Sequence, residues 1–296
     1  MNAPTHRYLS LGAGVQSSTV LLLAARGEIP AFDAAIFANT GWEPAAVYAH
    51  LRRLEQLATR SGIPVVRVAA GDIRRDALDP DHRFASMPLF TLGPNGERGM
   101  ARRQCTGEYK IKPIKVEVRR RLGYPYPARV PAGVIAEMAI GISLDEIGRA
   151  RDADVAYMRN VFPLLDLGWR RKDCLAYLAA HGWADTPRSA CVGCPFRTDA
   201  EWERLRRDDP TGWVDAVAFD AAIRHGSARA NAAGQPLRGQ FFLHRQRVPL
   251  DQVTLRPRTE AQTDVPGCGP WTCPHPDTAT EPTPDSSVAP GQEVRD

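Results

Sequence analysis

Short apolar runs alternate with amphipathic stretches over the first part of the chain. The apolar runs at 7–11, 34–38 and 64–69 predict three strands. Between them, residues 17–25 and 47–58 carry apolar side chains at helical spacing. This alternation of strand and helix predicts an open parallel sheet with right-handed crossovers, a design that binds ligands beyond the carboxyl ends of its strands.

The pattern continues toward residue 200. Residues 134–142 predict a fourth strand and 160–166 a fifth extended segment, while 110–122 and 170–181 are expected to form helices. Residues 71–104 show no clear period, and a long irregular segment inside a compact domain is usually functional or disordered. We therefore predict an α/β fold with a parallel sheet of about five strands flanked by helices, and a cysteine-bearing C-terminal extension.

Changes in composition divide the chain into three expected parts. Residues 1–200 are expected to form the main domain, and 201–273 a helical extension that carries a pair of cysteines. Residues 274–296 are rich in Pro, Asp, Glu, Ser and Thr and hold hardly any apolar side chain, so we expect a disordered tail.

Composition and charge narrow the class of protein. A hydrophobic content of 43% predicts a sizeable core, and a net charge of +4 is too small to argue for nucleic-acid binding. The arginines cluster at 102–103 and 119–121, a pattern more typical of a solvated helix face. Residues 1–7 lack the apolar stretch of a signal peptide, and no run reaches the roughly 18 apolar residues of a membrane span. We expect a cytoplasmic protein without membrane contact, whose six cysteines serve metal, cluster or redox chemistry.

A loop of small residues, 12–18, joins the first predicted strand to its helix. Backbone N–H groups, serine hydroxyls and the positive end of a helix dipole would meet there, and this combination suits a phosphate. The loop has neither the Lys of a P-loop nor the third Gly of the dinucleotide fingerprint. Two serines and a threonine exceed what one helix cap requires, so we favour phosphate binding over a plain capped turn.

The loop resembles a variant of the pyrophosphate-binding loop of the adenine-nucleotide alpha-hydrolase (PP-loop) superfamily, which has a Rossmann-like fold. Four further segments, in the same order, resemble one branch of it, the phosphoadenosine phosphosulfate (PAPS) reductase-like proteins. The matching segments span about residues 8 to 200 and are Gly12-Ala13-Gly14-Val15-Gln16-Ser17-Ser18, Phe37 to Glu43, Arg103 to Pro113, Gly141 to Arg149 and Pro163-Leu164-Leu165-Asp166.

The resemblance implies a site for ATP or an adenylyl-sulfate. Members either adenylate a substrate with release of pyrophosphate or reduce a sulfonucleotide. Lys110 and Arg149 are expected to neutralise the charge that develops on the phosphates. Gln16 stands where the family has an Asp, which removes a carboxylate that would help to hold Mg²⁺, and Ala13 stands where it has a Gly. The nucleotide-binding residues implied are Gly12, Ala13, Gly14, Gln16, Ser17, Ser18, Asn39, Thr40, Gly141 and Asp145.

The cysteines predict a second chemical centre. The Cys191-x-x-Cys194 spacing lets two thiolates reach one metal, and it fits half a zinc site, part of an iron–sulfur cluster or a redox dithiol. Cys105 supplies a third thiol from a loop on the same side of the sheet. We expect a [4Fe–4S] cluster, or alternatively Zn²⁺, on these three thiols, with Cys273 or Cys268 completing the set.

Cys268 and Cys174 each have a further expected role. Cys268 lies in Gly267-Cys268-Gly269, which partly resembles the C-terminal Glu-Cys-Gly of the PAPS reductases, so we predict a catalytic thiol there. Cys174 lies among apolar helix residues and is expected in the core.

Together these features predict an adenine-nucleotide-binding enzyme of sulfur chemistry, which adenylates a substrate and transfers sulfur from a donor. The first alternative is a sulfonucleotide reductase that uses Cys268 and a thioredoxin-like reductant. The second is a non-catalytic nucleotide-binding module with a structural zinc, suggested by Gln16. The acceptor substrate stays open, and a tRNA or DNA acceptor is a sub-case of the main hypothesis.

Overall fold

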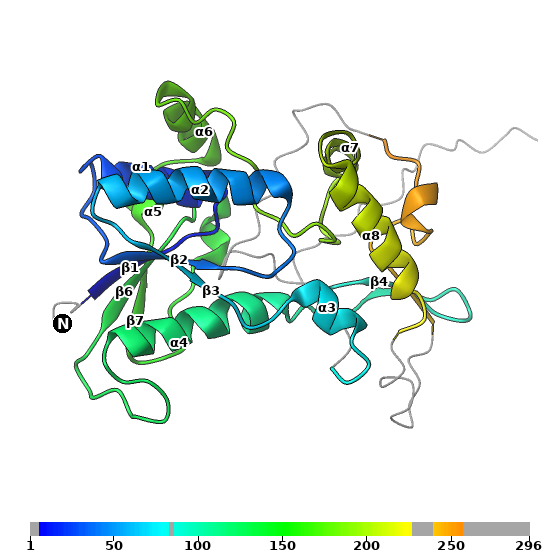
Figure 1. Ribbon diagram of the computed structural model, residues 1–296, viewed down its shortest axis with the longest axis horizontal. Helices are drawn as coiled ribbons and strands as arrows, with labels where there is room; N and C mark the ends of the chain where they lie inside the picture. Colours follow the sequence, from blue (N-terminus) through cyan, green and yellow to red (C-terminus); the bar gives the residue numbers. More distant parts are fainter. Residues whose placement is uncertain (1–5, 83–85, 227–238, 257–296) are drawn as a thin grey trace, which may run out of the picture.

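A parallel sheet of five strands organises one half of the molecule (Figure 1). The computed structural model describes residues 6–82, 86–226 and 239–256. The strands stand in the order β3-β2-β1-β6-β7, and every neighbouring pair is parallel. The predicted fold class is confirmed. In this order the strands span Val65–Val68, Ala34–Ala38, His6–Ser10, Ala136–Ile140 and Met158–Val161.

Helices cover both faces of this sheet (Figure 1). The face that carries α1 (Val15–Ala25) also carries α2 (Ala45–Arg60), α5 (Pro163–Asp166) and α6 (Arg171–Ala180). The opposite face is covered by α4 (Lys112–Arg121). Helix α1 packs against both α2 and α6 and is buried over almost its whole length, which explains why its second half, residues 20–25, is apolar on every side.

The order of the strands places a topological switch between β1 and β6. The chain moves from β1 outward to β2 and β3 and then returns to the other side of β1 with β6 and β7. All five residues of β1 pair with β6, from His6 with Ala136 to Ser10 with Ile140. In an open α/β sheet the crevice at such a switch is where ligands bind.

A second group of elements lies beside the carboxyl ends of the strands (Figure 1). It contains a small antiparallel sheet in the order β5-β4-β8 and the helices α7 and α8, which share one hydrophobic core with α3. A π-helical turn, Thr106–Ile111, leads directly into α4. The elements of this group are α3 Ile73–Leu78, β4 Phe90–Leu92, β5 Arg98–Met100, α7 Asp199–Asp208, α8 Pro210–Ala222 and β8 Gln240–Phe242, followed by the single turn Leu250–Gln252.

Most of the predicted elements are present, and two segments differ. Residues 163–166, which we expected to be extended, form α5, because Pro163 occupies the first helical position, where its missing N–H costs nothing. The segment 71–104, which shows no period, holds α3, β4 and β5. Cys174 is fully buried in the core, as predicted, and burial raises its pKa to about 12.

The second core contains residues from both sides of the expected domain boundary, among them Trp42 and Phe219. The division of the chain near residue 200 therefore stays a prediction. The expected disordered tail, residues 274–296, lies outside the described residues. No helix in the described ranges is long and apolar enough to cross a membrane.

Asp220 ties α8 to the last described segment, and its substitution tests that link. Its carboxylate accepts hydrogen bonds from Leu243 N at 2.7 Å and Leu250 N at 3.1 Å, and it pairs with Arg224. Removal of this buried carboxylate leaves its donors without a hydrogen-bond partner. We therefore expect Asp220→Ala to lower the free energy of unfolding by about 2–4 kcal/mol in urea titrations. Asp251→Ala, at an exposed position, is the control and should cost little. Equal losses for both variants would contradict this role.

Candidate functional site

The loop between β1 and α1 folds around a single hydroxyl group. Ser17 Oγ accepts hydrogen bonds from Gly12 N at 3.1 Å and Gly14 N at 3.3 Å. Ala13 between them has a φ of 53° and is fully buried, so the loop keeps a left-handed residue that costs on the order of 1–2 kcal/mol in a non-glycine. The first N–H groups of α1, which have no partner within the helix, follow directly from Val15. This arrangement presents positive backbone charge at the switch point of the sheet.

The next two hydroxyls face the core. Ser18 Oγ and His50 Nε2 are 2.9 Å apart, and Thr19 Oγ1 donates to Val15 O at 2.9 Å. Burial lowers the pKa of His50 to about 4, so the ring is neutral at physiological pH. The structure thus gives Ser18 and Thr19 partners inside the protein, which supplies a packing reason for the run of hydroxyls.

Gly141 brings the end of β6 against the same loop. A Cβ atom at this position would lie 2.8 Å from Ser17 N and 2.9 Å from Gln16 C. These are backbone atoms, which cannot move aside as a flexible side chain can. Only a glycine permits so close an approach. The residues that follow β6 therefore lie next to the loop 12–18, which we call the phosphate-type loop.

Those residues and helix α6 supply a charged group around Glu146. Arg149 pairs with the carboxylate of Glu146 at 3.0 Å. Arg171 donates from Nη1 to Gln16 Oε1 at 3.2 Å and from its backbone N to Asp145 Oδ1 at 2.7 Å. The side chain of Gln16 therefore joins the loop to the first turn of α6.

Glu146 is the most perturbed acid of this group. Its side chain is buried, and burial raises its pKa to about 7, although Arg149, Arg171 and Arg188 act in the opposite direction. Three arginines thus lie close enough to one carboxyl group to influence its ionisation. A carboxyl with a pKa near neutrality in the turn after β6 is suited to proton transfer, and the arginines are suited to phosphate oxygens.

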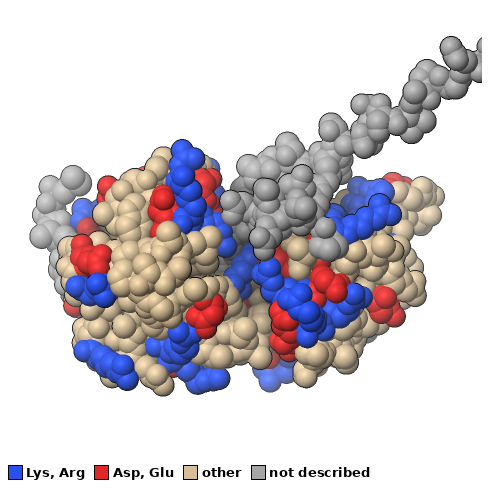
Figure 2. Space-filling view, turned by 90° about the horizontal axis from the view of Figure 1, so that it is seen from above, with Lys and Arg blue, Asp and Glu red and all other residues tan. Residues whose placement is uncertain are grey.

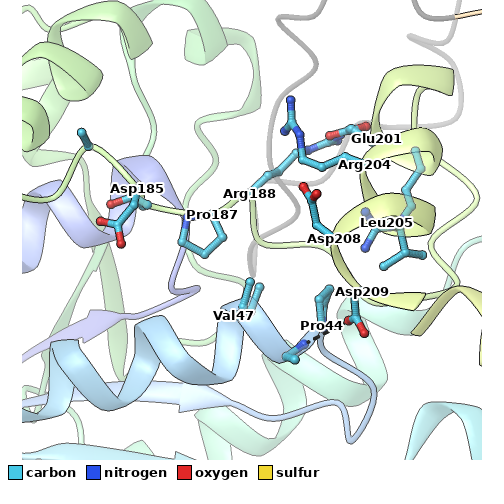
Figure 3. Close-up of a pocket in the computed structure, with 15 residues that line it drawn as sticks. Pro44, Val47, Asp185, Pro187, Arg188, Glu201, Arg204, Leu205, Asp208 and Asp209 are labelled. Carbon is cyan, nitrogen blue, oxygen red and sulfur yellow. Dashed lines mark hydrogen bonds and ion pairs between the residues drawn. The ribbon is translucent and has the colours of Figure 1, made fainter. Parts of the chain in front are cut away.

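Arg188 also borders a neighbouring pocket of about 370 Å³ (Figure 3). Figure 3 shows its side chain close to Glu201 of α7, with which it forms an ion pair. The opposite wall is formed by Pro44 and Val47 at the start of α2. Seen from above in Figure 2, Lys and Arg side chains gather along the hollow between the two halves of the molecule, with acidic side chains beside them.

The three cysteines at 105, 191 and 194 line one small pocket. Its other lining residues include Arg103, Lys110 and Thr40, and its open volume is about 20 Å³, room for about one water molecule. All three thiols are free of disulfide bonds. In the described ranges of the chain, no three His, Cys, Asp or Glu side chains are placed so that they could hold one metal ion.

The turn that carries two of these cysteines is held by a buried arginine. The guanidinium of Arg197 donates to the carbonyl oxygens of Ala190, Cys191 and Val192 at 2.9–3.2 Å. Burial lowers the pKa of Arg197. Gly193, at the centre of the turn, lies against the indole of Trp42, where a Cβ would come within 2.1 Å of the ring.

Thr40 connects the cysteine pocket to the sheet. Its Oγ1 lies 3.3 Å from Cys191 Sγ and donates to Glu43 Oε1 at 3.0 Å. Asn39, beside it at the end of β2, accepts hydrogen bonds from Gly41 N and from the hydroxyl of Tyr48. The phosphate-type loop and the cysteines are therefore neighbours, since Ser189 packs against Gly14 two residues before Cys191.

The structure brings the predicted residues together in two adjoining groups. One holds the loop 12–18 with Gly141, Asp145 and Arg149, and the other holds Thr40, Lys110 and the three cysteines. Cys268 and Cys273 lie outside the described residues.

Three charged residues of this region were missed by sequence reasoning. Arg171 and Arg188 belong to no motif, and their neighbourhood to Glu146 is visible only in three dimensions. Glu43 was quoted only as part of the motif after β2, yet its carboxylate is buried beside Cys191, with Sγ and Oε1 3.8 Å apart. In the sequence, the one indication of a role for Glu43 was its position three residues after Thr40.

Comparison with known proteins adds a distant likeness among solved structures. No family model and no curated protein matches the chain. Among solved structures, it is similar to the crystal structure of phosphoadenylyl-sulfate (PAPS) reductase from Candida auris in a phosphate complex, with a TM-score of 0.36 and 12% identity. The similarity covers 62% of this chain and 75% of that chain. The five-stranded parallel sheet is the architecture that the resemblance to PP-loop proteins implies, whereas so distant a likeness carries no argument about activity.

Substituting Gly141 tests the contact at the switch point. The added methyl of Gly141→Ala meets backbone of α1, so we expect a loss of about 1–3 kcal/mol in the free energy of unfolding, together with weaker ATP binding. Gly148→Ala, where a Cβ meets nothing within 4 Å, is the matched control. Calorimetric titration and urea unfolding measure both effects. Identical behaviour of the two variants would disprove the constraint.

The raised pKa of Glu146 predicts a pH-dependent stability. Its folded-state pKa of about 7 lies above the ordinary 4.5, so the folded protein holds this proton more tightly than the unfolded chain. The stabilisation is complete below pH 4.5 and is lost as the pH rises through 7. Relative to Glu146→Gln, the wild type should lose on the order of 3 kcal/mol of unfolding free energy between about pH 4 and about pH 8. A difference between the two proteins that does not vary with pH would contradict this assignment.

Proposed function

We propose that this protein is an adenine-nucleotide-binding enzyme of the PP-loop class, which adenylates a substrate and transfers sulfur to it with the help of a cysteine-bound [4Fe–4S] cluster. The observation that carries the proposal is the shared pocket of Cys105, Cys191 and Cys194, which adjoins a phosphate-type loop through Thr40 and Ser189. The combination of three thiols with a phosphate site is more specific than either feature alone.

The phosphate side of the proposal rests on charge. The N–H groups at the start of α1 and the guanidinium groups of Arg149, Arg171 and Arg188 would contact the phosphates of ATP or an adenylyl-sulfate. When a substrate oxygen attacks the α-phosphorus, the bond to the bridging oxygen breaks and pyrophosphate leaves with the negative charge. Arginines and Lys110 would stabilise that developing charge. Glu146 would accept the proton of the attacking group, since its pKa of about 7 allows it to do so near neutral pH.

By donor type the three thiols suit a thiolate-bound group, although the pocket, which has room for about one water molecule, would have to widen to admit a cluster. Cys105, Cys191 and Cys194 would be its ligands, and the positive charges of Lys110 and Arg103 in the same pocket favour the thiolate form. A cluster held by three protein thiolates would leave one iron open to a sulfur ligand. Lys110 lies in the turn Thr106–Ile111, is buried and lines the same pocket as the three thiols.

Anaerobic purification followed by metal analysis tests this proposal. The wild type should show a broad absorption band in the blue, about four iron and four sulfide per chain, and saturable ATP binding in calorimetry. Cys191→Ser and Cys194→Ser should each lose most of the iron because a ligand is removed, while ATP binding is retained.

Cys174→Ala is the matched control, since Cys174 lies in the core away from this pocket. It should keep the full iron content. Zinc without iron or sulfide would overturn the sulfur-transfer proposal in favour of a nucleotide-binding module with structural zinc. Iron that persists in both Ser variants would show that these cysteines are not ligands.

A further inference from the structure

We propose that the solvent-facing side of α4, together with the loop that follows it, binds a single strand of nucleic acid and stacks one of its bases on Tyr126. This face lies on the opposite side of the sheet from α1 and α2, and none of the other helices that the structure describes covers it (Figure 1). The proposal that nucleic acid binds here rests on the groove itself. The assignment of that nucleic acid as the acceptor substrate rests on the proposed function.

The groove is formed by two adjoining hollows of about 810 Å³ and 470 Å³, which share Arg119 and Tyr157. Five basic side chains line them, against one acidic side chain, Asp154. The basic residues are Lys112, Lys115, Arg119, Arg120 and Arg129. A concave surface with this excess of positive charge is complementary to a phosphate backbone.

Some of these cations are already paired inside the protein. Lys115 and Asp154 form an ion pair at 2.5 Å, and Arg120 pairs with Glu117 at 2.8 Å. Within the ranges that the structure describes, no carboxylate pairs with Lys112, Arg119 or Arg129. These three charges are therefore available to phosphates.

Arg119 is fixed in place by the loop that follows α4. Its guanidinium donates to the carbonyl oxygens of Tyr124 and Ala128, which neutralise no charge. A preorganised guanidinium loses little conformational entropy when it binds an anion. Arg119 thus provides a rigid positive centre in the middle of the groove.

Aromatic rings favour a nucleic acid over other polyanions. Tyr126 is 84% exposed, and the Arg119 guanidinium lies 5.8 Å from its ring centroid and 5.9 Å from that of Tyr157. A largely exposed tyrosine ring is accessible to a base, and aromatic side chains together with arginines are a common platform for stacking unpaired bases. The arginines at 119–121, which the sequence alone places on a solvated helix face, therefore belong in part to a binding surface.

One end of the groove lies at the π-helical turn Thr106–Ile111, which also contributes to the cysteine pocket. Gly107 and Ile111 line the groove, and Lys110, from the same π-helical turn, lines the pocket. Cys105 immediately precedes that turn. A strand that follows α4 would therefore bring a base to the region of the three thiols.

Fluorescence anisotropy with the full-length protein tests the docking. The probes are labelled RNA and DNA single strands of about 20 nucleotides, and a duplex of the same length, at salt concentrations between about 50 and 200 mM. Lys112→Gln/Arg129→Gln removes two exposed charges without breaking an ion pair, so the slope of log affinity against log salt should become shallower by about 1.4. Tyr126→Ala should weaken single-strand binding about fivefold to a hundredfold and leave that slope unchanged.

Arg52→Gln/Arg60→Gln on α2 is the matched control, because it removes the same charge from exposed positions on the opposite face. It should bind like the wild type. Tighter binding of RNA or of DNA supports the proposal in either case and identifies the source of the strand. The proposal is overturned if the control loses as much affinity as Lys112→Gln/Arg129→Gln, if polyphosphate competes as well as the oligonucleotide, or if Tyr126→Ala binds normally. Iron content and ATP binding are measured on the same samples, so failure of the docking and failure of the proposed function are distinguishable.

Discussion

The backbone contact between the end of β6 and the first turn of α1 constrains the rest of the site. Gly141 leaves no room for a side chain against Gln16 and Ser17, so the two sides of the topological switch touch directly. The turn Leu144–Arg149 follows within a few residues, and its charged side chains are therefore held beside the loop. A looser contact would separate the arginines from the N–H groups of α1, with which they would share an anion in the proposed site.

A second set of contacts joins the two halves of the molecule at the cysteines. Val192 N donates to Trp42 O at 2.8 Å, and the indole of Trp42 donates to Asp215 of α8 at 2.6 Å. Thr40 lies between the end of β2 and Cys191. The thiols are thus fixed by elements of both halves, and their geometry depends on how these halves pack.

Gln16, which carries no charge, contacts an arginine in this arrangement. Gln16 accepts a hydrogen bond from Arg171 without neutralising it, whereas an Asp would pair with that guanidinium. In the proposed site, arginines take over part of the charge balance that a carboxylate-bound Mg²⁺ would otherwise provide.

The sequence by itself determined the architecture, because apolar runs and helical spacing reflect burial that is local to each element, as β1, β2 and α2 show. It also predicted that Cys105 would lie beside Cys191 and Cys194, because strand ends of a parallel sheet meet at one edge, whereas phosphate binding by the loop 12–18 stays a prediction. It did not find α3, which packs into a core shared with α7 and α8. It also missed β4 and β5, which are three residues long and are held by antiparallel pairing of β4 with β5 and β8. Only the tertiary structure decided that Ser18 faces His50, that Arg171 and Arg188 approach Glu146, and that Tyr126 stands beside Arg119, since such contacts depend on distances between elements that no local pattern records.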